Sequence, residues 1–271
     1  MLLRPLLAAL AALASLPALA ADLDPRFAPA PVASRGWIVT VRANVGASPA
    51  FEGSNRTSLF AYPTLSVRRA GTQPRFSAPD DGIGIALYET PGFAVGPVVR
   101  YRAGRYTGDE RRLAGLDDVR WAVEPGLFLE LWPTSFARAR VEIRRGFHGH
   151  EGFVGTLGLD YVHRAGAMTL SIGPRAELGD GRFARDAFDV SAREALLNPS
   201  VTPYRAQGGL TAVGAAAALA YDWTPSVSTT LHGGYRRLVG SAAENPVTDR
   251  LGSRDQLSVG LRLSYSFGVD W

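Results

Sequence analysis

The C-terminal residues read Gln256-Leu-Ser-Val-Gly-Leu-Arg-Leu-Ser-Tyr-Ser-Phe-Gly-Val-Asp-Trp271, and they alternate without interruption. Every odd position is apolar, and every even position is small or polar. Successive side chains of a β-strand point to opposite faces, so the pattern predicts one long strand with an apolar and a polar face. A long strand that ends in an aromatic residue is typical of the last strand of a transmembrane β-barrel. The alternative at this point is the final strand of a soluble β-sandwich.

Residues 1–20 favour the barrel, because they have the features of a secretory signal peptide. Arg4 precedes an apolar run of leucine and alanine, and Ala18-Leu19-Ala20 has the small-x-small pattern that signal peptidase cuts after. The run is too short for a membrane-spanning helix. We expect export through the general secretory pathway of a Gram-negative bacterium, a periplasmic lead-in over residues 21–35, and a barrel over residues 36–271.

The composition agrees with an exported protein that is rich in turns. The 271 residues include 30 glycines and 18 prolines but no cysteine, which excludes a disulfide scaffold. All the basic side chains are arginine, and the net charge is +4. Acidic and basic residues are interspersed along the chain, which together with export argues against a nucleic-acid partner.

The same alternation recurs along the chain and predicts twelve strands. They cover residues 37–45, 59–67, 75–78, 83–87, 93–101, 119–131, 137–143, 153–163, 168–178, 210–222, 227–238 and 256–271. Four prolines fall inside these strands, where each removes one hydrogen bond of the ladder and predicts a bulge or bend. They are Pro63, Pro97, Pro125 and Pro174, and if several of their strands were broken the count would fall to ten.

The connections between the predicted strands sort by length. The even-numbered ones are tight, and all the long ones are odd-numbered: residues 48–56, 105–118, 146–152, 180–207 and 240–254. Residues 79–82 are a short connection that falls in the same outer set. Bacterial barrels have long extracellular loops and short periplasmic turns. We therefore predict an all-β, antiparallel transmembrane β-barrel of about 12 strands in the lipid of the outer membrane.

Several short motifs, in order over about 220 residues, resemble the MltA-interacting protein (MipA/OmpV) family of outer-membrane proteins. Residues 48–54 read Ser-Pro-Ala-Phe-Glu-Gly-Ser, near the family's P-x-Y-x-G-S, and residues 240–247 are close to its G-D-A-A-x-S-P-I. Tyr62-Pro63, residues 96–105, 113–119 and 149–152, and the closing strand also fit. Residues 187–191 depart from the family's Y-F-G-V-S, since they read Ala-Phe-Asp-Val-Ser, so what this loop binds is expected to differ.

The resemblance implies an envelope scaffold that joins a periplasmic lytic transglycosylase to a murein synthase. Other family members are linked to the passage of small molecules or to adhesion. The predicted periplasmic turns have only a few residues each, a small surface compared with the about 800 Å² per partner of an ordinary stable interface. Scaffolding by the turns alone is therefore disfavoured, although the scaffold remains our first expectation.

The alternative function is a narrow pore for small solutes. Ten polar side chains are expected to face the lumen: Arg100, Arg102, Arg120, Glu124, Glu130, Arg138, Arg140, Glu142, Arg144 and His232. A twelve-stranded barrel lies between a filled interior and a water channel, so these charges either line a narrow pore or pair across the lumen and fill it. An open pore with this arginine excess would favour anions. Residues 180–207, with a short helix over 192–197, either plug the lumen or form a surface loop.

An enzyme is the least supported class. His148 and His150 flank Gly149 beside Glu151, a spacing that suits a metal, but no second group of ligands lies near them in sequence. His163 lies at a strand end on the apolar face, and no serine has a recognisable nucleophile setting. We expect no catalytic residue, no metal site and no cofactor.

Overall fold

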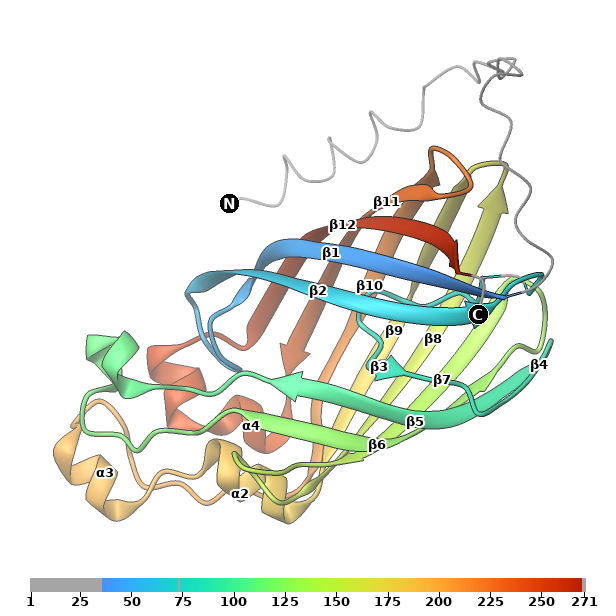
Figure 1. The fold of residues 1–271 in the computed structure, drawn as a ribbon. Coiled ribbons are helices and arrows are strands. Elements are labelled where there is room, and N and C mark those ends of the chain that lie inside the picture. The colour runs from blue at the N-terminus through green and yellow to red at the C-terminus, as the bar shows by residue number, and fades with distance from the viewer. Residues whose placement is uncertain (1–35, 73, 270–271) are drawn as a thin grey trace. The chain divides into compact units, whose positions relative to one another are not determined.

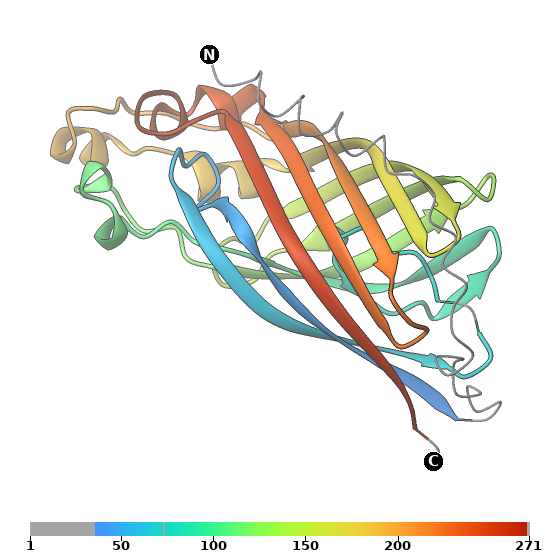
Figure 2. The same ribbon diagram turned by 90° about the horizontal axis from the view of Figure 1, so that it is seen from above.

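The computed structural model describes residues 36–72 and 74–269, which form one antiparallel sheet that curls on itself (Figures 1 and 2). The predicted signal peptide, the lead-in and Trp271 lie outside the described residues. Ten strands have nine to fifteen residues, long enough to cross the hydrocarbon core, for which about 9–11 residues suffice. They are β1 (Trp37–Pro49), β2 (Thr57–Arg69), β5 (Phe93–Arg102), β6 (Ala122–Leu131), β7 (Ala137–Arg145), β8 (Phe153–Ala165), β9 (Met168–Gly179), β10 (Gly209–Asp222), β11 (Val227–Leu238) and β12 (Asp255–Val269). Two strands are short, β3 (Ile83–Gly84) and β4 (Tyr88–Thr90).

The predicted fold class and the strand count of about 12 are confirmed. From β5 to β12 each strand pairs with its neighbours in sequence, and β12 also pairs with β1, as in Val41 opposite Tyr265. The sheet therefore runs from β2 through β1 and β12 back to β5. Its two edges, β2 on one side and β3 and β4 on the other, have no further partner strand among the described residues.

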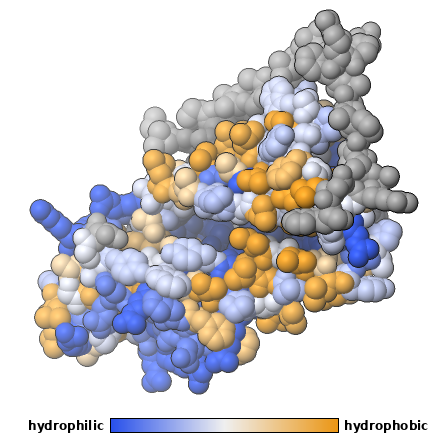
Figure 3. All heavy atoms as spheres, in the orientation of Figure 1, coloured by the Kyte–Doolittle hydropathy of each residue, from blue (hydrophilic) through white to orange (hydrophobic). Residues whose placement is uncertain are grey.

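The period of two gives the sheet an apolar convex face and a polar concave face. Leu127, Ile143, Leu157, Leu257 and Val259 are exposed on the convex face, as the alternation predicts. An outward band of this kind is what lipid requires of a transmembrane barrel. Figure 3 shows hydrophobic side chains gathered over the strands and hydrophilic ones over much of the loop end. No helix in the described part of the chain is long and apolar enough to span a bilayer.

The four strand prolines do not break their strands. Pro125 lies one residue before the first pair between β6 and β7, and Pro63 lies on the edge strand β2. Pro174 interrupts the ladder between β8 and β9 locally, because the pairing resumes only on either side of it. Arg175 bridges this interruption, since its Nη1 donates to the Leu159 carbonyl at 3.0 Å.

The prediction for residues 75–82 is wrong in two respects. Residues 75–78 form no strand, and residues 79–82 do not lie with the outer loops. Instead, residues 74–82 fold against the concave face, where Arg75, Asp80 and Asp81 pair with charged side chains of the wall. The alternation of residues 75–78 could not reveal this, because their charged partners lie 55 or more residues away in sequence.

The long connections all lie at one end of the sheet and carry its helices (Figure 1). These are α2 (Gly181–Phe188), α3 (Ala192–Leu197), α4 (Gly240–Glu244), the 3-10 turns η3 (Thr107–Asp109) and η4 (Arg111–Leu113), and the π-helical turn η5 (Val247–Leu251). Asp180 caps α2, and a capping box formed by Ser191 and Glu194 begins α3. Helix α3 covers the residues expected to be helical. Phe183 and Phe188 of α2 pack with alanines of α4 and with Leu238, so the loops have a core of their own.

Candidate functional site

The concave face has two walls of different chemistry. We name the inward side chains of β5 to β9 the charged wall, and those of β10, β11, β12, β1 and β2 the small-residue wall. The charged wall consists largely of ionic side chains that have almost no solvent exposure. Those on the strands are Glu124, Glu130, Arg138, Arg140, Glu142, Arg144, Asp160 and Glu177.

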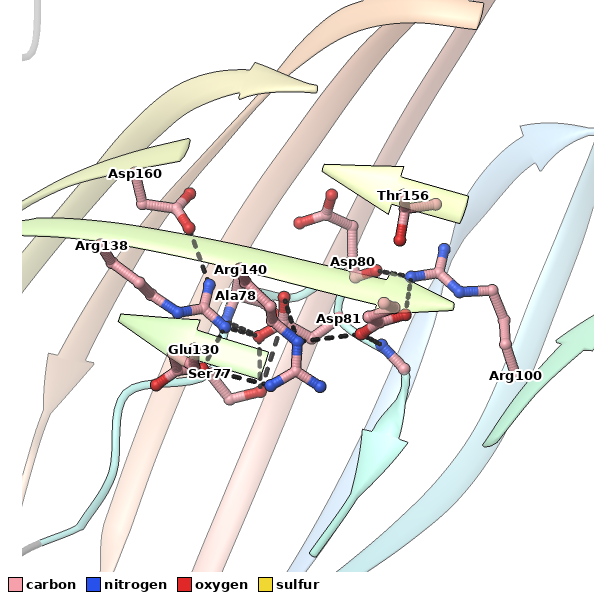
Figure 4. Close-up of polar contacts among 12 residues, drawn as sticks. Ser77, Ala78, Asp80, Asp81, Arg100, Glu130, Arg138, Arg140, Thr156 and Asp160 are labelled. Atoms are coloured by element: carbon pink, nitrogen blue, oxygen red, sulfur yellow. Dashed lines mark hydrogen bonds and ion pairs between the residues drawn. The ribbon is translucent and has the colours of Figure 1, made fainter. Parts of the chain in front are cut away.

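Arg138, on β7, lies at the centre of the charged wall and contacts carboxylates from three other segments. Its terminal nitrogens lie 2.5 Å from Asp81, 2.8 Å from Glu130 and 2.7 Å from Asp160 (Figure 4). Arg140 adds a second contact to Glu130 at 3.1 Å. Buried ions stay charged only when they are paired and hydrogen-bonded. This network therefore holds four segments together at fixed positions.

The inward segment, residues 74–82, is part of the same network. The Asp80 carboxylate accepts hydrogen bonds from Arg175 at 2.6 and 3.1 Å, and the backbone N–H of Gly82 donates to Glu142 at 3.0 Å. Figure 4 shows the turn of this segment among the side chains of the charged wall. The segment consequently thickens the charged wall and narrows the space enclosed by the sheet.

A second ion cluster joins the loop end to the sheet. Glu52, in the β1–β2 loop, lies 2.6 Å from Arg102 of β5 and 2.9 Å from Arg236 of β11. Arg102 also contacts Glu124 at 2.6 Å, and Arg236 contacts Glu177 at 3.2 Å. Since β5 and β11 lie far apart in the order of strands, these ion pairs extend across the concave side near the loops.

The two loop histidines have different partners. His150 is buried, with Nε2 3.0 Å from Glu124 and its ring edge-on to Phe183. His148 instead stacks on Trp121 with a centroid distance of 4.3 Å. Residues 36–72 and 74–269 contain no group of three or more His, Cys, Asp or Glu side chains arranged to hold a metal ion.

The small-residue wall is open where the charged wall is packed. Register and alternation direct serine, threonine, alanine and glycine to this face, and Figure 3 shows a hollow between β2 and β5 with hydrophilic atoms deep within it. Many of these residues are partly exposed, so the accessible space inside the curl lies along this wall. They include Thr40, Ala216, Ala220, Ser228, Thr230, Gly234, Ser258 and Ser266.

Three of the basic side chains on this wall, Arg42, Arg262 and His232, lie close together on adjacent strands. Arg42 of β1 pairs in register with Ser264, two residues from Arg262 of β12, and His232 of β11 lies opposite Gly260. Such diagonal neighbours on one face are within reach of long side chains. Within the described part of the chain, no carboxylate lies within 4 Å of any of the three. The small-residue wall therefore presents positive charge to the accessible space.

The structure distributes the predicted lumen residues over both walls and the loop end. His232 lies on the small-residue wall. For Arg120 the predicted strand is wrong, because β6 begins at Ala122 rather than at residue 119. The exposed Arg120 side chain precedes the strand. The remaining eight belong to the ion pairs of the charged wall: Arg100, Arg102, Glu124, Glu130, Arg138, Arg140, Glu142 and Arg144.

Sequence reasoning missed other members of both walls for two reasons. Arg42, Arg262 and Arg175 occupy inward positions of predicted strands, and the alternation alone would have found them. Glu52 and Asp80 lie in connections, where no period relates a side chain to the concave face. Only the folded chain brings these two carboxylates to their arginines.

The loop at residues 180–208 is fixed to its neighbours through Glu194. Its carboxylate accepts hydrogen bonds from the backbone N–H groups of Ser191 at 2.7 Å and of Asp117 at 2.9 Å. Burial opposes ionisation of this carboxyl group, but the hydrogen bonds to its charged form prevail and hold the pKa of Glu194 below its usual range. The ionised side chain thereby links α3 to the β5–β6 loop.

Comparison with solved structures finds outer-membrane proteins of low sequence identity. The KdgM porin is 12% identical, with a TM-score of 0.38 over 85% of this chain and 99% of that one. The NanC porin is 11% identical, with a TM-score of 0.41 over 84% and 98%. An outer membrane channel from Pseudomonas putida F1 is 13% identical, with a TM-score of 0.44 over 91% and 100%.

One family model matches most of the chain. The search among curated proteins finds no sequence that matches it. The family model described as MltA-interacting protein MipA matches residues 41–267, which extend from within β1 nearly to the end of β12. Together with the curled antiparallel sheet and its apolar convex face, this match shows that the chain belongs to the MipA family and is an outer-membrane β-barrel protein.

Proposed function

We propose that this barrel is a narrow passage for small anionic solutes across the outer membrane. The observation that carries the proposal is the contrast between its arginines. Those of the charged wall are in ion pairs, whereas Arg42 and Arg262 face the accessible space with no carboxylate within 4 Å among the described residues. Positive side chains that line a narrow aqueous passage favour anions.

The charged wall supports the same proposal, because its own positive and negative charges cancel. Asp80 and Asp81 point toward the enclosed space, but Arg175 and Arg138 neutralise them at 2.6 and 2.5 Å. An anion that passes along the small-residue wall therefore meets a nearly neutral wall on the other side. Because the inward segment and the Glu52 cluster occupy part of the interior, we expect a low conductance.

The direct test is the current through the purified, refolded barrel in a planar bilayer with a KCl gradient. We expect small, reproducible steps and a reversal potential that indicates a preference for chloride over potassium. The Arg193→Gln variant, which changes an exposed side chain of α3, serves as a matched control and should leave both quantities unchanged. A folded barrel without steps, or with a preference for potassium, would refute the proposal.

A scaffold for murein enzymes is the second candidate, supported by the family description, MltA-interacting protein. The described turns opposite the loop end are short, for example Pro91-Gly92 between β4 and β5 and Gly166-Ala167 between β8 and β9. A stable interface of about 800 Å² per partner would need more surface than these turns offer. Co-purification from cross-linked envelopes, followed by identification of a lytic transglycosylase or a murein synthase, would support the scaffold.

We further propose that the barrel has no catalytic activity and that it reaches the membrane by the general secretory pathway. Export with cleavage after Ala20 predicts a mature N-terminus at Ala21, which N-terminal sequencing of the membrane-extracted protein checks. An N-terminus at Met1 in the outer-membrane fraction would contradict this route.

A further inference from the structure

We propose that Arg42 and Arg262 form a binding site for one oxyanion, a carboxylate or a phosphate group, on the small-residue wall. This inference rests on the proposed function in that the passage brings the solute to the site. Binding itself, however, requires only access from one end of the barrel, so the two can be tested separately.

The site begins with the register of β1 and β12. Asn44 pairs directly with Arg262, and Arg42 lies two residues before Asn44 on the same face of β1. The two arginines are therefore diagonal neighbours on adjacent strands, and their guanidinium groups reach the same region of the concave face. Placing two like charges this close is unfavourable unless an anion lies between or beside them.

Asn44 holds one of the two arginines in place. This asparagine is buried, and its Nδ2 donates to the Tyr62 carbonyl at 3.2 Å and to Thr64 Oγ1 at 3.4 Å. The orientation of the amide is thereby set, and Asn44 Oδ1 accepts a hydrogen bond from Arg262 Nε at 2.8 Å. The terminal nitrogens of Arg262 remain available to a ligand.

Further polar groups border the two arginines. The hydroxyl groups of Thr40 and Ser266, 2.8 Å apart, lie next to Arg42 on the same face. The ring of His232 lies against Gly260, where an added Cβ would come within 2.6 Å of Cε1. Gly260 thus makes room for an imidazole beside Arg262, which adds a third nitrogen-bearing group to the site.

The chemistry of these groups selects an oxyanion. A guanidinium group donates two parallel hydrogen bonds that match the oxygens of a carboxylate or a phosphate. On the charged wall the protein supplies such oxygens itself, as for Arg138, which contacts three carboxylates. Asp80 and Asp81 are the carboxylates that influence His232 and Arg262 electrostatically, but they lie more than 4 Å from them. Their short contacts are to Arg175 and Arg138 instead. At Arg42 and Arg262, by contrast, a bound ligand would supply the oxygens.

The test measures binding of inorganic phosphate and of acetate to the full barrel in detergent by isothermal titration calorimetry. In parallel, each anion is titrated against the chloride current in a planar bilayer. For Arg42→Gln or Arg262→Gln we expect the dissociation constant of the preferred anion to rise at least about tenfold, because a hydrogen bond to a charged group is lost. Arg193→Gln on α3 is the control that should bind as the unmodified protein does.

Arg262→Lys separates a ligand site from a general effect of positive charge. Lysine keeps the charge but not the paired hydrogen bonds of a guanidinium group, so anion binding should fall although the net charge is unchanged. Comparison of acetate with phosphate assigns the ligand chemistry, since the anion with the lower dissociation constant identifies the group that the site prefers.

The outcomes separate this site from the passage. Binding that depends on Arg42 and Arg262 in a barrel that conducts no current would support the site and refute the passage. A conducting barrel whose anion binding and block are unchanged in the Arg42→Gln/Arg262→Gln double variant would refute the site and leave the passage standing. Absence of phosphate and acetate binding to the unmodified, folded protein would also overturn the site.

Discussion

The two walls of the concave face are built from the same kind of alternating strand, yet they differ in packing. On the charged wall, long arginine and glutamate side chains fill the interior and neutralise one another, as Arg144 does with Glu124 and Glu142. On the small-residue wall, alanine, serine and glycine leave space, and Arg42 and Arg262 have no carboxylate within 4 Å in the described chain. A barrel with one packed wall and one open wall combines a rigid frame with space for the passage that we propose along the open wall.

The largest effect is expected at the centre of the charged wall. Arg138→Ala would leave Asp81, Glu130 and Asp160 close together without their shared cation. Removing one partner of a buried ionic network costs about 3–5 kcal/mol, so the free energy of unfolding in urea should fall by that amount. Arg262→Ala on the small-residue wall is the matched comparison, and an equal loss there would remove the distinction between the walls.

A smaller effect is expected for the ion cluster near the loops. Glu52→Gln weakens contacts to Arg102 and Arg236, which should lower the free energy of unfolding by about 1–3 kcal/mol. If this cluster restricts the passage at the loop end, single-channel conductance should rise in the same variant. Unchanged conductance together with reduced stability would limit Glu52 to a structural role.

On the small-residue wall, an added side chain should change passage more than stability. Ala216 is partly exposed on the concave face, so Ala216→Leu should alter the free energy of unfolding by less than about 0.5 kcal/mol. The same change should reduce the conductance, because the longer side chain enters the accessible space. A large loss of stability would show that this wall is packed as tightly as the other.

The smallest effect concerns the loop that Glu194 fixes. Because its pKa is lowered in the folded protein, Glu194 stabilises the loop above its unfolded-state pKa of about 4.3. That contribution is lost as the pH falls through the lower folded-state pKa. The protection of the amides of residues 190–201 against hydrogen exchange, relative to an unstructured chain at the same pH, should therefore fall in acid, and Glu194→Gln should remove this acid dependence. Identical acid profiles for the two proteins would contradict the assignment.

The strands were predictable because their signal is local. The closing strand β12 and its partner β1 alternate over most of their length, and the tight turns between hairpins indicated the order of the strands. The alternation also placed Glu124 and Arg144 on the inward face. It could not show that they form ion pairs, because pairing depends on the distance between strands that are not adjacent in sequence.

The connections were the least predictable part of the molecule. Asp81 and Glu52 lie in segments without a period, and their partners are set by tertiary contacts over about 50 or more residues of sequence. Residues 75–78 are the converse case. Their alternation predicted a strand, but they form none and fold against the charged wall instead. Local patterns decide the wall of the barrel, and long-range charge pairing decides its interior.

The most direct test of this account is cysteine accessibility in the bilayer, which the absence of native cysteine makes unambiguous. Thr230 lies on the small-residue wall opposite Arg262, and Ser171 is buried on the charged wall. Each is replaced by cysteine in turn, as Thr230→Cys and Ser171→Cys. We expect an anionic, water-soluble thiol reagent to modify Thr230→Cys and reduce its current while leaving Ser171→Cys unmodified. Rapid modification of Ser171→Cys with protection of Thr230→Cys would contradict the assignment of the passage to the small-residue wall.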